Sequence, residues 1–73
     1  MAEKITFEIV KKCGVISEGN NGWTKELNMV SWNGKAPKYD LRDWSEDHTK
    51  MGKGLTLTEE ELVKLGELIE EVK

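Results

Sequence analysis

The sequence predicts an α+β fold in which four β-strands are followed by one C-terminal α-helix. Two observations on the 73 residues support this prediction. Up to residue 57, apolar and polar side chains alternate in short runs separated by glycine- and asparagine-rich turns, as is typical of strands. From residue 58 onward, apolar side chains recur every three or four positions, as is typical of a helix. We expect residues 1–73 to form one domain.

The N-terminal region is expected to form two short strands. Residues 4–10 alternate strictly, with Ile5, Phe7 and Ile9 on one side, which predicts a half-buried strand. Two lysines then mark a bend, and residues 14–17 continue as a second short strand. We therefore expect the chain to change direction once before its first turn.

Two longer strands are expected on either side of a second turn. Residues 18–22 and 33–37 are rich in glycine and asparagine, which tolerate positive φ and favour turns. Residues 23–32 have the composition of a strand and are predicted to be the third one, although apolar side chains lie on both of its sides. A β-bulge, or a sheet covered on both faces, would explain them. Residues 38–44 are predicted to be the fourth strand.

The C-terminal helix has the strongest local signal in the chain. Residues 45–54 are polar and charged and predict a loop, and residues 55–57 predict a brief strand that leads into the helix. Thr58 is a good N-cap, and Glu61 three residues later completes a capping box. The helix is amphipathic, so we expect its apolar side to lie on the sheet, on a partner helix or on both. This apolar stripe consists of Leu62, Leu65, Ile69 and Val72.

The size and composition of the chain restrict the classes of protein that it fits. A chain this short is near the lower limit at which a single core is stable alone, so a partner subunit is expected to add stability. Cys13 is the single cysteine, which excludes an internal disulfide and favours a reducing, cytoplasmic setting, with association with the nucleoid as an option. No apolar run approaches the roughly 20 residues of a membrane span, and no signal peptide is expected.

The formal net charge of −3 is unevenly distributed. Residues 58–73 contain six glutamates and two lysines, whereas residues 1–57 contain nine basic and eight acidic side chains. The acidity belongs to the C-terminal segment, and the remainder is close to neutral. The net charge by itself therefore neither supports nor excludes a nucleic-acid partner.

The predicted fourth strand carries the strongest functional signal. Side chains of a strand alternate between its faces, so Lys38, Arg42 and Trp44 share one face. Tyr39 and Leu41 then point to the other face, toward a core. A face with two cations and an indole is poorly explained by packing, and it suits a flexible polyanion with flat bases. Single-stranded nucleic acid is such a partner.

Several other side chains extend this candidate interface. Each lysine could instead be a solubilising surface residue, and acidic neighbours weaken the positive field. Trp32 and Trp44 are candidates for base stacking, whereas Trp23 is equally consistent with the margin of a small core. The predicted nucleic-acid contacts are Lys25, Trp32, Lys35, Lys38, Arg42, Trp44, Lys50 and Lys53.

Catalysis and metal binding have little support in the sequence. The chain has one histidine, one cysteine and one tyrosine, with no pattern that pairs a nucleophile with a base. His48 has two acidic neighbours but no second histidine or cysteine nearby, so we expect it to be a solvated loop residue and not a metal ligand. We expect no enzyme activity, no cofactor and no small-molecule substrate.

The fourth strand, the charged loop and residues 53–57 before Thr58 resemble the core of the positive cofactor four family of transcriptional coactivators. In that family, a strand with alternating hydrophobic, aspartate and arginine positions ends in two aromatic residues. A loop, a Lys-Gly-hydrophobic-Ser-Leu segment and a helix follow. From Phe7 to the end, the chain resembles the small bacterial YdbC-type proteins more closely.

This resemblance implies a strongly curved antiparallel sheet followed by one helix, assembled as a symmetric dimer through the helices and the sheet. It also implies binding of single-stranded DNA along the β-surfaces with little sequence preference. Arg42 matches the arginine of the family's strand, Lys53 the lysine before its glycine, and Trp44 one of its two aromatic positions. The chain has a single aromatic residue there, and it lacks the Ser- and Lys-rich N-terminal region of the eukaryotic coactivators.

The predicted function is therefore binding of single-stranded DNA by a homodimer, in transcription regulation or in DNA replication and repair. One alternative is a dimeric protein-interaction module of the transcription machinery. A second alternative is binding of single-stranded RNA, because stacking and phosphate contacts barely distinguish the two nucleic acids. The helix stripe is the expected dimer interface, and no membrane partner is expected.

Overall fold

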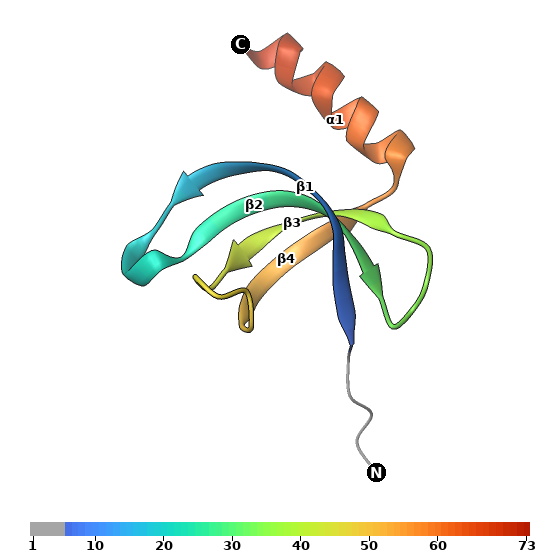
Figure 1. The fold of residues 1–73 in the computed structure, drawn as a ribbon. Coiled ribbons are helices and arrows are strands. Elements are labelled where there is room, and N and C mark those ends of the chain that lie inside the picture. The colour runs from blue at the N-terminus through green and yellow to red at the C-terminus, as the bar shows by residue number, and fades with distance from the viewer. Residues whose placement is uncertain (1–5) are drawn as a thin grey trace.

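In the computed structural model, which describes residues 6–73, a four-stranded antiparallel sheet is followed by one helix, as predicted. The strands pair in the order of the sequence. Figure 1 shows the sheet as a single curved layer, with the helix rising from its convex side. The elements are β1 (Phe7–Glu18), η1 (Asn20–Gly22, a 3-10 turn), β2 (Thr24–Trp32), β3 (Lys38–Trp44), β4 (Met51–Leu57) and α1 (Glu59–Val72).

Strand β1 is one continuous element where the sequence predicts two short strands. It has 12 residues against the 9 of β2, and its three register shifts each insert one extra residue, at Val10, Cys13 and Ile16. A bulge bends a strand and increases its twist, so three bulges account for the arch of β1 in Figure 1. Residues 4–5 of the predicted first strand lie outside the described residues.

The predictions for the other strands meet with mixed results. Strand β3 has the predicted bounds, and β2 pairs with it without interruption, so a sheet with apolar side chains on both faces explains the third-strand pattern. Strand β4 begins at Met51, whereas a loop was predicted up to residue 54. The predicted number of four strands is correct because two predicted strands merge into β1 and the brief last strand is longer than expected.

The connections follow the turn signals of the sequence. Asn33 and Gly34 both have positive φ, of 53° and 75°, and the amide of Lys35 donates a hydrogen bond of 2.9 Å to the carbonyl oxygen of Trp32. Two central residues with positive φ define the turn geometry that Asn-Gly favours. This turn fixes the place at which the chain leaves β2.

The core of the chain lies on the concave face and is small. Val30 and Trp44 are its two buried apolar side chains among residues 6–73. Asn28 and Asp40 are buried beside them. Tyr39 and Leu41 are only half-buried and lie on the convex face, because they alternate with the buried positions of β3. The prediction that these two residues point to the core is therefore wrong.

Helix α1 has the predicted capping box but little contact with the sheet. The Thr58 hydroxyl accepts a hydrogen bond from the Glu61 amide at 3.2 Å, and the Glu61 carboxylate accepts one from the Thr58 amide at 2.9 Å. No residue of α1 is buried. The helix starts next to β4 and then extends away from the sheet (Figure 1). Among residues 6–73, no helix is long and apolar enough to cross a membrane.

Candidate nucleic-acid interface

Trp32 and Arg42 form the centre of the candidate site. The guanidinium carbon of Arg42 lies 4.8 Å from the centre of the Trp32 ring, which is cation–π geometry. Nε of Arg42 donates to both carboxylate oxygens of Asp40, at 2.6 Å for Oδ2. A further hydrogen bond of 3.3 Å runs from Nη1 to the carbonyl oxygen of Gly52. Because Asp40 is fully buried, the arginine is held in one orientation.

These two residues line a hollow on the concave face, which we call the concave groove. Its lining residues include Phe7, Trp32, Arg42, Thr49, Met51 and Thr56. The ring centres of Phe7 and Trp32 lie 5.9 Å apart, so the apolar part of the groove is aromatic on one side. The groove therefore combines aromatic surface, one fixed cation and a few hydroxyl groups.

The predicted lysines are not all placed around this groove. Lys38 shares the face of Arg42 by strand alternation and is exposed. Lys35 is exposed in the connection after Trp32, and Lys53 is exposed at the register shift of β4. Lys25 alternates with the buried positions of β2 and thus lies on the convex face, away from Trp32.

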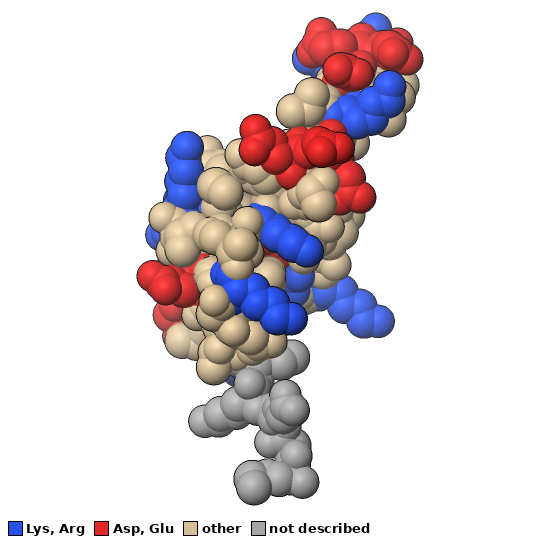
Figure 2. All heavy atoms as spheres, turned by 90° about the vertical axis from the view of Figure 1, so that its right-hand side faces the viewer, with Lys and Arg blue, Asp and Glu red and all other residues tan. Residues whose placement is uncertain are grey.

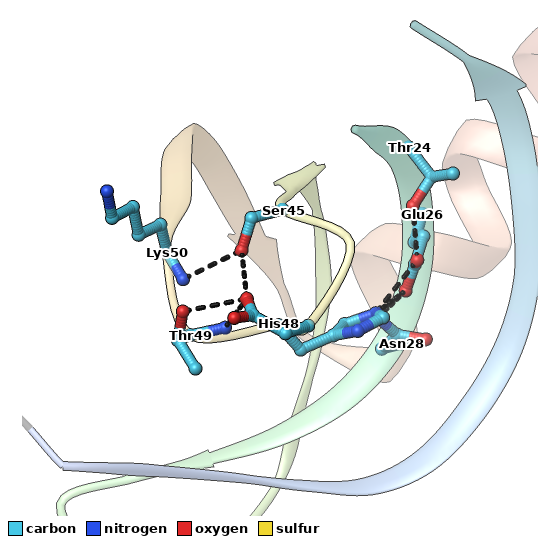
Figure 3. A network of polar contacts seen from close by, with 8 residues as sticks. Thr24, Glu26, Asn28, Ser45, His48, Thr49 and Lys50 are labelled. Carbon is cyan, nitrogen blue, oxygen red and sulfur yellow. Dashed lines mark hydrogen bonds and ion pairs between the residues drawn. The ribbon is translucent and has the colours of Figure 1, made fainter. Parts of the chain in front are cut away.

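Lys50 ends the loop between β3 and β4, and Figure 3 shows its side chain pointing away from this loop. Its backbone is fixed at both polar groups. The Lys50 amide donates to the Ser45 hydroxyl oxygen at 3.0 Å, and its carbonyl oxygen accepts from the Ser45 amide at 2.9 Å. The ammonium group is therefore presented to solvent from an ordered loop.

Trp44 is buried, and this corrects its predicted role. Its exposed fraction is 0%, and its ring centre lies 5.2 Å from that of Phe7 and 5.7 Å from that of His48. Trp44 shares a face with Arg42, as strand alternation predicts, but these two aromatic rings cover the indole. A base cannot stack on a ring without free surface, so we assign Trp44 to the core and exclude it from the interface.

A polar network under the groove was not found from the sequence. Nε2 of His48 lies 2.9 and 3.1 Å from the two carboxylate oxygens of Glu26, which is buried on β2 (Figure 3). Thr24 and Asn28 also donate hydrogen bonds to this carboxylate. His48 is thus a partner of a buried acid and not the solvated loop histidine that we predicted. The separation of 22 residues between the two explains why no local pattern indicated the pair.

This network also changes the acidity of Glu26. Burial raises its pKa, but the hydrogen bonds from Asn28, Thr24 and His48, together with the charge of His48, outweigh burial. The net result is a pKa below the ordinary value of 4.5. The carboxylate is therefore ionised at neutral pH and can only accept, so the proton at Nε2 of His48 belongs to the histidine.

Acidic side chains predominate on the helix, whereas the sheet carries both signs of charge. In Figure 2, Asp and Glu side chains cover much of the helix, while Lys and Arg side chains project from the sheet below it. The first turn of α1 alone contains three glutamates, Glu59, Glu60 and Glu61. A polyanion is therefore repelled by the helix more than by the sheet.

A curved four-stranded antiparallel sheet with a single C-terminal helix and an aromatic, cationic groove defines a class of small sheet-based domains. Residues 19–68 match the family model described as Transcriptional Coactivator p15 (PC4). The chain is also 49% identical over 63 residues to an uncharacterized protein of Treponema pallidum (strain Nichols), which covers 86% of this chain and 74% of that protein. The chain belongs to the PC4 family, as the resemblance predicted.

Membership of this family indicates a nucleic-acid-binding, coactivator-like domain. The matched region begins at Gly19, so it includes β2, β3, β4 and most of α1. Both residues of the Trp32–Arg42 pair lie within it. The narrower likeness to YdbC-type proteins stays a prediction.

Proposed function

We propose that the chain forms a homodimer that binds single-stranded DNA in the concave groove, with little sequence preference. The observation that carries this proposal is the Trp32–Arg42 pair, at 4.8 Å in a groove whose lining also includes Phe7 and two threonines. Aromatic rings stack with any base, and cations beside them attract the phosphates. The family membership points to the same class of ligand.

The strand's phosphates are expected to contact cations that border the groove. Asp40 neutralises part of the charge of Arg42. We therefore expect Arg42 to act on the strand mainly through direct hydrogen bonds and less through long-range electrostatic attraction. Lys35, Lys38, Lys50 and Lys53 are all exposed, and we expect them to supply the positive field that attracts the strand. These four lysines and Arg42 are the phosphate contacts that we propose.

A second copy of the chain is the proposed partner of helix α1. The apolar stripe is half-buried at Leu62 and Leu65 but 45% exposed at Ile69 and 83% exposed at Val72. The core has too few apolar residues to make a chain of this size stable alone, so burial of the stripe is expected to come from outside the chain. In a symmetric dimer, the stripe of one copy packs against the same stripe of the other copy.

Binding is tested with fluorescence anisotropy of a labelled single strand of about 20 nucleotides, compared with a duplex of equal length, across a salt series. We expect tight binding of the single strand and weak binding of the duplex. The slope of log K against log salt is expected to lie near −0.7 for each phosphate contact on a single strand. Matched RNA competitors then separate DNA binding from RNA binding.

Variants connect this binding to the concave face. Trp32→Ala is expected to weaken single-strand binding by about 1–3 kcal/mol, the contribution of one stacked base. Lys38→Ala is expected to reduce the magnitude of the salt slope by about 0.7. Lys25→Ala is the matched control, because Lys25 lies on the convex face, and its salt slope should equal that of the wild type. A wild-type chain that binds no single strand at low salt would disprove the proposed function.

A further inference from the structure

A second hollow adjoins the concave groove where η1 meets the loop between β3 and β4, and we call it the loop pocket. Thr49 lines both hollows, so the two are neighbours at this residue, and a strand bound in the groove can be extended toward the loop pocket. Of the residues that line it, only Lys50 is a nucleic-acid contact predicted from the sequence. Its lining residues include Trp23, Ser45, Glu46, Asp47, Thr49 and Lys50.

Trp23 presents the aromatic surface of the loop pocket. Its side chain is half-buried, unlike that of Trp44, so part of the indole remains accessible. Its backbone amide and its backbone carbonyl group are both hydrogen-bonded. The Trp23 amide donates a hydrogen bond of 3.1 Å to the carbonyl oxygen of Asn20. The Trp23 carbonyl oxygen accepts a hydrogen bond of 2.7 Å from the Gly19 amide. The ring is therefore attached to a hydrogen-bonded turn.

Two carboxylates make the loop pocket unlike the groove. Three hydrogen bonds from Ser45 and Thr49 reach Oδ1 of Asp47, and Oδ2 receives none from residues 6–73. The bonds from Thr49, and then that from Ser45, lower the pKa of Asp47 to about 2, so it is charged at neutral pH.

Glu46 is exposed and lies against η1. A Cβ at Gly22, which has a φ of +80°, would be 3.1 Å from Glu46 Oε1. Within the described part of the chain, its carboxylate has no hydrogen bond or ion pair. Two carboxylates repel a phosphate, so the pocket fits a neutral group that donates hydrogen bonds.

We propose that the loop pocket accepts one base of the bound strand, stacked on Trp23, and prefers guanine to thymine. This inference rests on the proposed binding of single strands in the concave groove. Guanine offers adjacent N1–H and N2–H donors on its Watson–Crick edge, which match a carboxylate that only accepts. Thymine offers one N3–H between two carbonyl oxygens, which face the carboxylates unfavourably. Lys50 at the rim contacts the phosphate of the same nucleotide.

The test compares two single strands of about 16 nucleotides, an oligo-dT and an alternating dT-dG sequence, by anisotropy at one salt concentration. The wild type is expected to bind the alternating strand more tightly. Glu46→Gln should reduce the ratio of the two affinities toward one. Loss of a negative charge also raises the affinity for any polyanion. This effect is equal for the two strands, so it leaves the ratio of their affinities unchanged.

Substitution of the indole supplies a second readout. Trp23→Leu keeps an apolar side chain but removes the ring, and it should weaken binding of the alternating strand by about fivefold to a hundredfold, the range of one stacking interaction. Trp23→Phe should retain most of the affinity. Circular dichroism establishes that the variants are folded. If Trp23→Leu is unfolded, Trp23→Phe and Glu46→Gln decide the question.

The outcomes separate this inference from the proposed function. Equal binding of both strands by the wild type, or wild-type affinity in Trp23→Leu while Trp32→Ala loses affinity, would overturn the base-accepting role of the loop pocket and leave groove binding intact. Failure of the wild type to bind either strand would overturn both. A reduced affinity ratio in Glu46→Gln, with Trp32→Ala weakened on both strands, supports both.

Discussion

The position of Arg42 depends on a single missing side chain on the neighbouring strand. Gly54 of β4 lies opposite Arg42. A Cβ at Gly54 would lie 2.3 Å from the Cβ of Arg42 and 2.5 Å from the carbonyl oxygen of Leu41. Neither atom belongs to the flexible end of a side chain, so the strands themselves would have to move apart. The glycine thus allows β4 to pair closely beside the residue that forms the centre of the groove.

Gly54→Ala is therefore expected to lower the free energy of unfolding by about 1–3 kcal/mol, the usual cost of overpacking. Urea unfolding at fixed protein concentration measures this change. Gly52→Ala is the matched control, because a Cβ at Gly52 meets Asp43 at an ordinary distance of 3.6 Å. Its stability should stay within about 0.5 kcal/mol of the wild type. Equal stability of the two variants would contradict the close approach at Gly54.

Individual residues were predictable only where strand alternation decided their position. Arg42 and Lys38 share a face because β3 has the predicted bounds, and alternation within a strand is a local property. The burial of Trp44 depends on Phe7, which belongs to a strand that is not its neighbour in the sheet. Curvature brings these rings together, and alternation within β3 contains no information about curvature.

At the scale of elements, the pair of His48 and Glu26 connects the loop between β3 and β4 to β2. The pKa of Glu26 is lower in the folded chain than its ordinary value of 4.5. Folding therefore favours the ionised carboxylate. The resulting stabilisation is present above pH 4.5 and is lost as the pH falls through the pKa of the folded state.

Glu26→Gln removes this titration and tests the sign of the effect. At neutral pH, the variant is expected to be less stable than the wild type by about 1–3 kcal/mol, because His48 loses a charged acceptor. The difference should shrink as the pH falls below 4.5, where the wild type becomes protonated. Urea unfolding at a series of pH values measures it. A difference that stays constant or grows toward acid pH would contradict the assigned role.

Element boundaries were predictable where local signals specify them. The capping box of α1 and the Asn-Gly turn after β2 involve residues within four positions of one another, and both agree with the structure. The start of β4 was missed because Gly52-Lys53-Gly54 lacks the alternating apolar residues of a strand, and backbone pairing with β3 keeps it extended. The bulges of β1 likewise arise from pairing with β2, and the sequence of β1 suggested only one bend.

At the scale of the whole molecule, the two faces of the sheet have different roles. The concave face holds the small polar core and the groove, whereas β1, β4 and α1 keep large apolar side chains in solvent. Among these are Val10, Val15, Ile16, Leu55, Leu68 and Ile69. Contiguous exposed apolar surface is typical of an interface. The proposed dimer would cover the part of this apolar surface that lies on α1, and the helix rises from the side of the sheet opposite the groove (Figure 1).

Ile69→Glu places a charge in the apolar stripe of α1 and is expected to convert the dimer to a monomer, which sedimentation measures directly. Lys64→Glu is the matched control, because the Lys64 side chain is 65% exposed and does not belong to the stripe. It changes the net charge by more than Ile69→Glu does, so general repulsion would affect the control more strongly. A control that stays dimeric while Ile69→Glu dissociates locates the interface on the stripe. A monomeric wild type at micromolar concentration would exclude the proposed dimer.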